Sequence, residues 1–66
     1  MNATTGTTHE RVRKDVADRL ARIEGHLRAV RGMWDEDRGC ADVLTQIGAV
    51  RAALEKVARI VLEDHM

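Results

Sequence analysis

Cys40 and His65 are the two residues of this sequence whose chemistry best suits a metal ion. They lie 25 residues apart. Because 25 steps of about 100° come within about 20° of seven full turns, both side chains would share one face of a single helix. A thiolate and an imidazole together suit a soft or borderline ion, namely Cu(I), Zn(II), Ni(II) or Co(II), and the thiolate favours copper. The pair therefore predicts a metal site, provided that the fold brings the two residues together.

One helix cannot bring them together, because at about 1.5 Å per residue they would lie nearly 40 Å apart along the axis. If this helix pairs antiparallel with a second copy of itself about a two-fold axis near Ala52 and Ala53, Cys40 of one chain meets His65 of the other. Such a dimer would hold two identical sites. The spacing alone leaves an alternative, in which Cys40 is a small apolar core residue and His65 only complements the helix dipole.

Two long apolar patterns predict the helices that position these residues. In each pattern, apolar residues recur at steps of three and four, which is typical of an amphipathic helix. Between them, residues 35–39 (DEDRG) form the one concentrated run of turn residues. The apolar residues are Val12, Val16, Leu20, Ile23, Leu27, Val30 and Trp34 in the first pattern, and Val43, Ile47, Val50, Leu54, Val57 and Val61 in the second.

These elements predict an all-α fold, an antiparallel hairpin with helices at about 9–35 and 40–65. Residues 1–8 are predicted to form a disordered N-terminal arm that ends in Thr8 as the helix N-cap, and residues 9–66 to form one helical domain. A chain of 66 residues with a single cysteine cannot form an internal disulfide and usually needs a partner chain. One hairpin also leaves much of both apolar stripes exposed. We therefore expect two hairpins to pair as a four-helix bundle.

The charges are balanced overall and unevenly distributed. The 11 basic and 11 acidic side chains give a formal net charge of zero. Residues 9–34 carry seven basic and four acidic side chains, and residues 35–66 carry four and seven, so the two halves are +3 and −3. Arg19 and Arg22 belong to a basic cluster away from the first apolar stripe, which is either a phosphate-binding surface or a solvated face with Asp15 and Asp18 interleaved.

Several functional classes are excluded or disfavoured. The sequence has no apolar run long enough to span a membrane and no signal peptide near Met1, which predicts a cytoplasmic protein without membrane contact. It has no nucleophile and base pair, no phosphate-binding glycine loop and no paired carboxylates in a plausible cleft, so it is not expected to be an enzyme. His26 is expected to be solvated, and His9 lies where it could turn toward a site.

Two segments carry a family resemblance: RLARIEGHLRAVRGM at 19–33 and DEDRGCADVLTQIGAVRAALEKVARIVLEDH at 35–65. The R-L-x-R-I-E-G-H block, the C-x-D-V-L-T-Q-I core and the 25-residue interval between cysteine and histidine together resemble the CsoR/RcnR family. Members are small bacterial repressors that sense copper, nickel, cobalt, formaldehyde or persulfide. Gln46 matches a hallmark of the family to which we assign no role.

The resemblance implies a metal site shared between chains. It implies that Cys40 of one protomer and His65 of another are ligands, with a further ligand four positions after His65. This sequence stops at Met66 and lacks the short third helix of the family, so we expect the natural chain to continue. Gly39 stands where copper-sensing branches usually carry tyrosine.

The resemblance also implies operator DNA as a partner, contacted by basic faces of a tetramer that is a dimer of dimers. Arg19 and Lys56 match positions implicated in that contact, and Arg22 lies beside Arg19. The sequence thus predicts a Cu(I)-sensing transcriptional repressor that leaves its operator when the metal bridges two protomers. The alternatives are a nickel, cobalt or formaldehyde sensor of the same family, or a structural or adaptor helical dimer without ligand.

Overall fold

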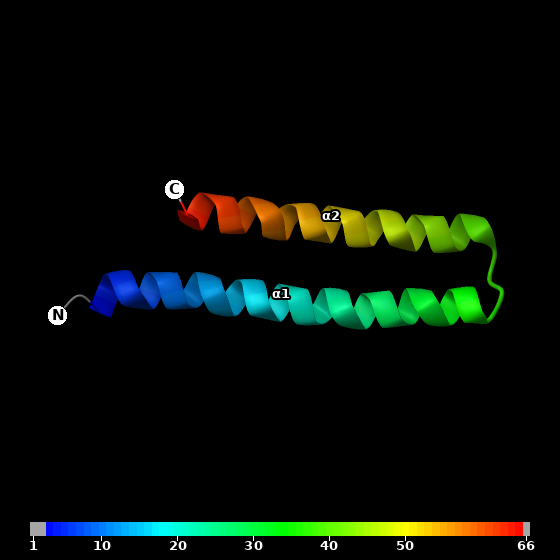
Figure 1. Cartoon of the computed structure of the whole chain (residues 1–66), viewed down its shortest axis with the longest axis horizontal. Helices are drawn as coiled ribbons and strands as arrows, with labels where there is room; N and C mark the ends of the chain where they lie inside the picture. Colours follow the sequence, from blue (N-terminus) through cyan, green and yellow to red (C-terminus); the bar gives the residue numbers. More distant parts are fainter. Residues whose placement is uncertain (1–2, 66) are drawn as a thin grey trace.

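The computed structural model of the protein describes residues 3–65, with side chains from Thr8 onward. It contains two helices, α1 (Ala3–Asp35) and α2 (Cys40–His65). They run antiparallel and side by side, so the start of α1 lies near the end of α2 (Figure 1). The predicted all-α hairpin is confirmed. Neither helix, over the residues described, is long and apolar enough to cross a membrane.

Helix α1 begins earlier than the sequence predicted. It starts at Ala3 rather than at His9, so the prediction of a disordered arm over residues 1–8 is wrong for 3–8, and residues 1 and 2 lie outside the described residues. Thr8 lies inside the helix and is therefore not its N-cap. The segment contains no proline, and each residue added to an existing helix gains one backbone hydrogen bond, so a stretch of weak helix formers can continue α1 toward its N-terminus.

The turn between the helices is closed by a Schellman motif. The amide of Arg38 donates to the carbonyl of Met33 at 2.9 Å, and the amide of Asp37 donates to the carbonyl of Trp34 at 3.0 Å. Asp37 has a φ of 60°, which is the left-handed conformation that this motif requires. Gly39 is the N-cap residue directly before α2, since its carbonyl accepts hydrogen bonds from the amides of Asp42 and Val43. The predicted turn at 35–39 is confirmed in place.

We expect Asp37→Gly to stabilise the folded protein by up to about 1 kcal/mol, because glycine adopts the left-handed conformation without the steric penalty of a Cβ atom. Urea unfolding followed by circular dichroism measures the change. Asp35→Gly is the matched control: Asp35 lies inside α1, where glycine destabilises a helix. Equal effects of the two substitutions would contradict the role given to Asp37.

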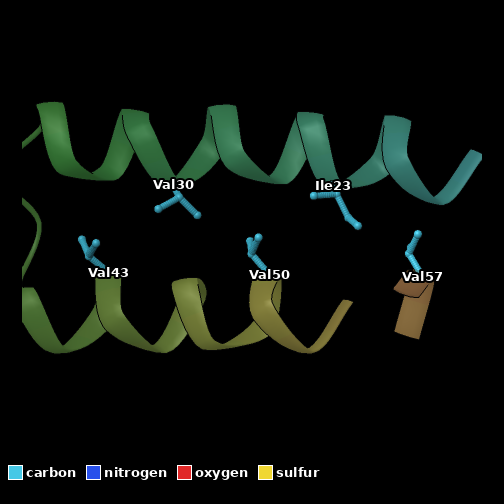
Figure 2. Close-up of a cluster of buried hydrophobic side chains, with 5 residues drawn as sticks. All are labelled: Ile23, Val30, Val43, Val50 and Val57. Carbon is cyan, nitrogen blue, oxygen red and sulfur yellow. The ribbon is translucent and has the colours of Figure 1, made fainter. Parts of the chain in front are cut away.

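The core of the hairpin is a single line of five buried side chains, each 5–7% exposed (Figure 2). On each helix the buried residues repeat at intervals of seven. Val16, Met33 and Ala53 pack against this line. The buried residues are Ile23 and Val30 of α1, and Val43, Val50 and Val57 of α2. The contact between the helices therefore uses only part of each apolar stripe.

The rest of both stripes is exposed on one side of the hairpin. Each exposed residue of the stripes lies four positions after a buried residue of the core line, except Leu20, which lies four positions after the half-buried Val16. In an antiparallel pair, these positions of the two helices lie beside each other, and grooves lined by both helices confirm the arrangement. We call this surface the apolar face; it comprises Leu20, Leu27, Trp34, Ile47, Leu54 and Val61.

Candidate functional site

Cys40 is the first residue of α2 and lies at the turn end of the apolar face. Its thiol is free and the residue is exposed. It lines an open, apolar groove of about 470 Å³ together with Trp34 of α1 and Ile47 of α2. Trp34, the one tryptophan of the sequence, is 64% exposed there. A thiol is therefore presented among apolar side chains on a surface that this chain alone does not cover.

His65 is the last described residue of α2 and lies at the other end of the apolar face. It lines one groove with Leu20 and Val61, and a second with Val61 and Leu62. His9 lies in the first groove as well, where its Nδ1 is 3.1 Å from a carboxylate oxygen of Asp64. The structure thus brings His9 to the end of the molecule that carries His65.

The structure does not bring Cys40 and His65 together within one chain. They occupy the two ends of the 26-residue helix α2, which is about 40 Å long. Among the described residues, no group of three histidine, cysteine, aspartate or glutamate side chains could hold a metal ion. The two donors nevertheless fit copper chemically, because a thiolate selects the soft ion Cu(I) and an imidazole also suits copper. A site built from them requires two copies of the chain.

The opposite side of the hairpin carries the predicted DNA-binding residues. Arg19 and Arg22 line one open cavity of about 140 Å³, together with Ile23, His26 and, from α2, Ala53. Lys56 directly precedes the buried Val57, just as Arg22 directly precedes the buried Ile23, so the two occupy equivalent positions on the two helices. We call this side the basic face; it comprises Arg19, Arg22, His26 and Lys56.

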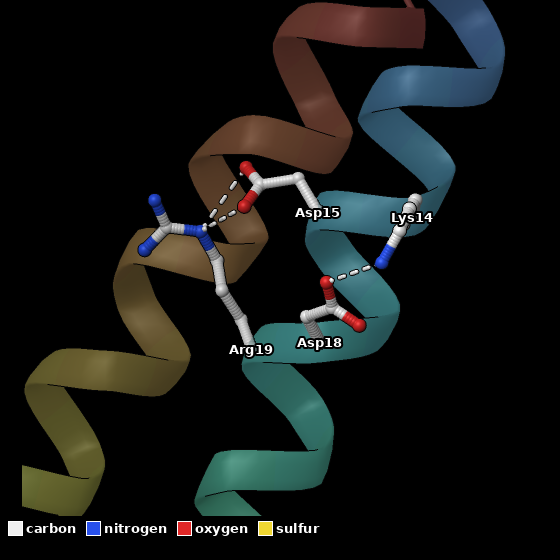
Figure 3. A network of polar contacts seen from close by, with 4 residues as sticks. All are labelled: Lys14, Asp15, Asp18 and Arg19. Carbon is white, nitrogen blue, oxygen red and sulfur yellow. Dashed lines mark hydrogen bonds and ion pairs between the residues drawn. The ribbon is translucent and has the colours of Figure 1, made fainter.

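Ion pairs hold some of the basic side chains of α1 and leave others available. Arg19 donates from Nε to both carboxylate oxygens of Asp15, at 3.1 and 3.2 Å (Figure 3). Lys14 pairs with Asp18 at 3.0 Å in the same view. Arg22 and Lys56 make no ion pair in the part of the chain that the structure describes. Their charges are therefore not neutralised by a neighbouring carboxylate.

The structure also joins two residues that the sequence left without a role. Nε2 of His26 lies 2.7 Å from Oε1 of Gln46, and this hydrogen bond links α1 to α2. The expectation that His26 is solvated is wrong, because its side chain is half-buried between the helices. The seven-residue repeat of the buried side chains could have predicted this contact. His26 lies three positions after the buried Ile23, and Gln46 lies three positions after the buried Val43. In a helix with such a repeat, this position also faces the neighbouring helix.

Two copper-sensing repressors resemble this chain over most of its length. The copper-sensing transcriptional repressor CsoR of Bacillus subtilis is 50% identical over 50 residues, which are 76% of this chain and 50% of that protein. The copper-sensing transcriptional repressor RicR of Mycobacterium tuberculosis is 44% identical over 66 residues, which are 100% of this chain and 67% of that protein. The chain thus spans half to two thirds of the length of these relatives.

A solved structure shows the same arrangement of helices. The Copper-Sensing Operon Regulator Protein (CsoRGz) superimposes with a TM-score of 0.78 at 55% sequence identity, over 80% of this chain and 88% of that one. Residues 12–66 match the family described as metal-sensitive transcriptional repressor. The predicted resemblance to the CsoR/RcnR family is confirmed, and the chain belongs to this family of metal-sensitive transcriptional repressors.

Proposed function

We propose that the protein is a Cu(I)-responsive transcriptional repressor of the cytoplasm, which binds operator DNA without metal and releases it when metal is bound. The observation that carries this proposal is the position of Cys40 and His65 at opposite ends of one apolar face. A second copy of the chain, placed antiparallel on that face, brings each cysteine to a histidine of its partner. The copper-sensing relatives support copper as the metal.

The occupant of the apolar face is a second copy, which completes a four-helix bundle. Six large apolar side chains lie along this face, whereas five side chains are buried among the residues that the structure describes. A contiguous exposed surface of large apolar side chains is typical of an interaction site. The midpoint between Cys40 and His65 falls at Ala52 and Ala53, so the two-fold axis of the proposed dimer would pass near the middle of α2. Two such dimers would then form the tetramer.

The metal is bound by Cys40 of one protomer and by His65 of the partner subunit. Cu(I) held by these two residues would form a bridge between the chains, for which Cys40 would supply a thiolate and His65 a neutral imidazole. Once the partner covers the groove, the apolar side chains around Cys40 would exclude water from the thiolate and favour a soft ion over a strongly hydrated one. The bridge favours the arrangement of the two chains in which Cys40 and His65 are close.

The basic face lies on the side of the hairpin opposite the metal site, so Cu(I) and operator DNA can bind the same assembly without competing for one surface. Metal binding weakens DNA binding only through a change in how the chains are arranged. By linkage, operator DNA must weaken metal binding by the same factor. The corresponding coupling free energy is typically about 1–3 kcal/mol. Measuring Cu(I) affinity with and without operator DNA tests this reciprocity.

We expect Arg22→Ala and Lys56→Ala each to weaken operator binding and to reduce the dependence of affinity on salt. Each lost phosphate contact should lower the slope of log K against log salt concentration by roughly 0.9. Fluorescence anisotropy at several salt concentrations gives the slope, and Arg19→Ala completes the set. Lys14→Ala is the control, because Lys14 lies outside the basic face and is already paired with Asp18. Unchanged slopes in all three variants would place the DNA-binding surface elsewhere.

A gel shift with promoter DNA from the operon of the protein separates the repressor from a structural or adaptor dimer. The full-length repressor is expected to bind this DNA selectively, in a salt-sensitive manner, and to release it on addition of Cu(I). Ni(II) and Co(II), added in parallel, test the other metals of the family. Absence of selective DNA binding would favour the adaptor dimer.

A further inference from the structure

The cavity of the basic face contains a histidine beside two arginines. His26 lines it together with Arg19 and Arg22, all three from one side of α1. The wall supplied by α2 is Ala53, whose small side chain leaves the space open. The charged side chains that line the cavity with the histidine are therefore those of the two arginines, and the carboxylate of Asp15 is already engaged by Nε of Arg19.

The hydrogen bond to α2 fixes how the imidazole can act. Oε1 of Gln46 is an acceptor only, so Nε2 of His26 carries the proton of this bond. In the neutral ring Nδ1 then has no proton to donate. Nδ1 becomes a donor only when the ring takes up a second proton and becomes an imidazolium. A phosphate in the cavity favours that form, because an anion beside an imidazolium stabilises its charge.

Arg19 and Arg22 are arranged to receive the same anion. The carboxylate of Asp15 engages Nε of Arg19, and in Figure 3 the two terminal nitrogens of its guanidinium group point away from Asp15. Within the described chain Arg22 has no ion pair at all. Guanidinium groups suit phosphate oxygens because they offer several N–H donors in one plane.

We propose that this cavity binds one phosphate group of the operator backbone, with His26 as a third ligand beside Arg19 and Arg22. As the phosphate enters, Nδ1 takes a proton from the solvent buffer and donates it in a hydrogen bond to a phosphate oxygen. DNA binding is thereby coupled to the uptake of one proton per occupied cavity, and Gln46 is a positioning residue that orients the ring. This proposal rests on the proposed function, since it requires an operator.

Operator affinity of the metal-free, full-length protein, measured by fluorescence anisotropy at constant ionic strength, tests the coupling. We expect His26→Gln to bind nearly as well as the unmodified protein at about pH 8 and about tenfold more weakly at about pH 6, where an imidazole gains its proton. His9→Gln is the matched control, because His9 lies at the far end of the hairpin. The operator affinity of the His9→Gln variant, relative to that of the unmodified protein, should be the same at both pH values. A His26→Gln ratio that is the same at both pH values would overturn the proposal.

Calorimetry provides a measurement that does not depend on the variant. Titration of the unmodified protein with operator DNA at about pH 7, in two buffers of different ionisation enthalpy, is expected to show net proton uptake. No uptake would overturn the proposal even if His26→Gln failed to fold. Inorganic phosphate without DNA is expected to produce no saturable uptake; if it does, the cavity is a site for free phosphate instead. Loss of selective DNA binding at every pH would contradict the proposed function itself.

Discussion

In a protein carrying Cys40→Ala, Cu(I) affinity is expected to fall by two to three orders of magnitude, and operator DNA should stay bound when copper is added. Cys40 is the one cysteine of the sequence, and a thiolate is a ligand that selects Cu(I). Binding of structural Zn²⁺ at a four-ligand site is worth about 10–16 kcal/mol, which is about 2.5–4 kcal/mol for each ligand and gives the scale of the loss. Competition with a Cu(I) chelator measures the affinity, and anisotropy with labelled operator measures release. His65→Ala should have a smaller effect on both, because imidazole is a neutral donor.

Mixed dimers give the sharper test of a site shared between chains. When a Cys40→Ala chain pairs with a His65→Ala chain, one site loses both ligands and the other keeps both. Such a dimer, purified through two different tags, is expected to bind one metal with near-native affinity. A site built within one chain would leave no intact site in this dimer. If the mixture binds copper no better than the two single-variant homodimers, the antiparallel pairing of α2 is wrong.

Leu54→Glu is expected to abolish dimerisation. Leu54 is 44% exposed in the single chain and lies on the apolar face near the proposed two-fold axis, so a dimer buries two copies of it close together. Full burial of an exposed leucine side chain contributes about 1.5–3 kcal/mol, and somewhat less than half of each Leu54 remains to be buried, so loss of two raises the dissociation constant by roughly one to two orders of magnitude. Two buried carboxylates would add to the penalty. Sedimentation velocity measures assembly, and circular dichroism measures the helix content that remains.

Ala52→Glu is the matched control for this substitution. Ala52 is exposed at nearly the same height along α2 but lies about 160° around the helix from Leu54, away from the apolar face. The same glutamate at this position should leave the dimer intact. If Leu54→Glu remains dimeric, or if both substitutions dissociate the protein equally, the apolar face is not the surface that binds the second copy.

The sequence by itself determined the helices and the separation of the two candidate ligands. An apolar repeat at steps of three and four residues is typical of an α-helix. The segment DEDRG at 35–39 interrupts this repeat at one point, so the sequence predicts two helices joined by a turn. The rise per residue of a helix then keeps Cys40 and His65 about 40 Å apart, and only a second chain can join them. None of these conclusions depends on how the helices are rotated about their axes.

The tertiary structure decided which part of each stripe is buried. The apolar stripe is wider than the contact that one helix makes with one neighbour, so its amphipathicity permits several rotations of each helix. The pairing chosen buries the line from Ile23 to Val57 and turns Leu54 and Cys40 outward to a shared face. The same rotation places His26 against Gln46 on the other side. This cross-helix contact depends on the register between two segments 20 residues apart, which the pattern within either helix does not contain.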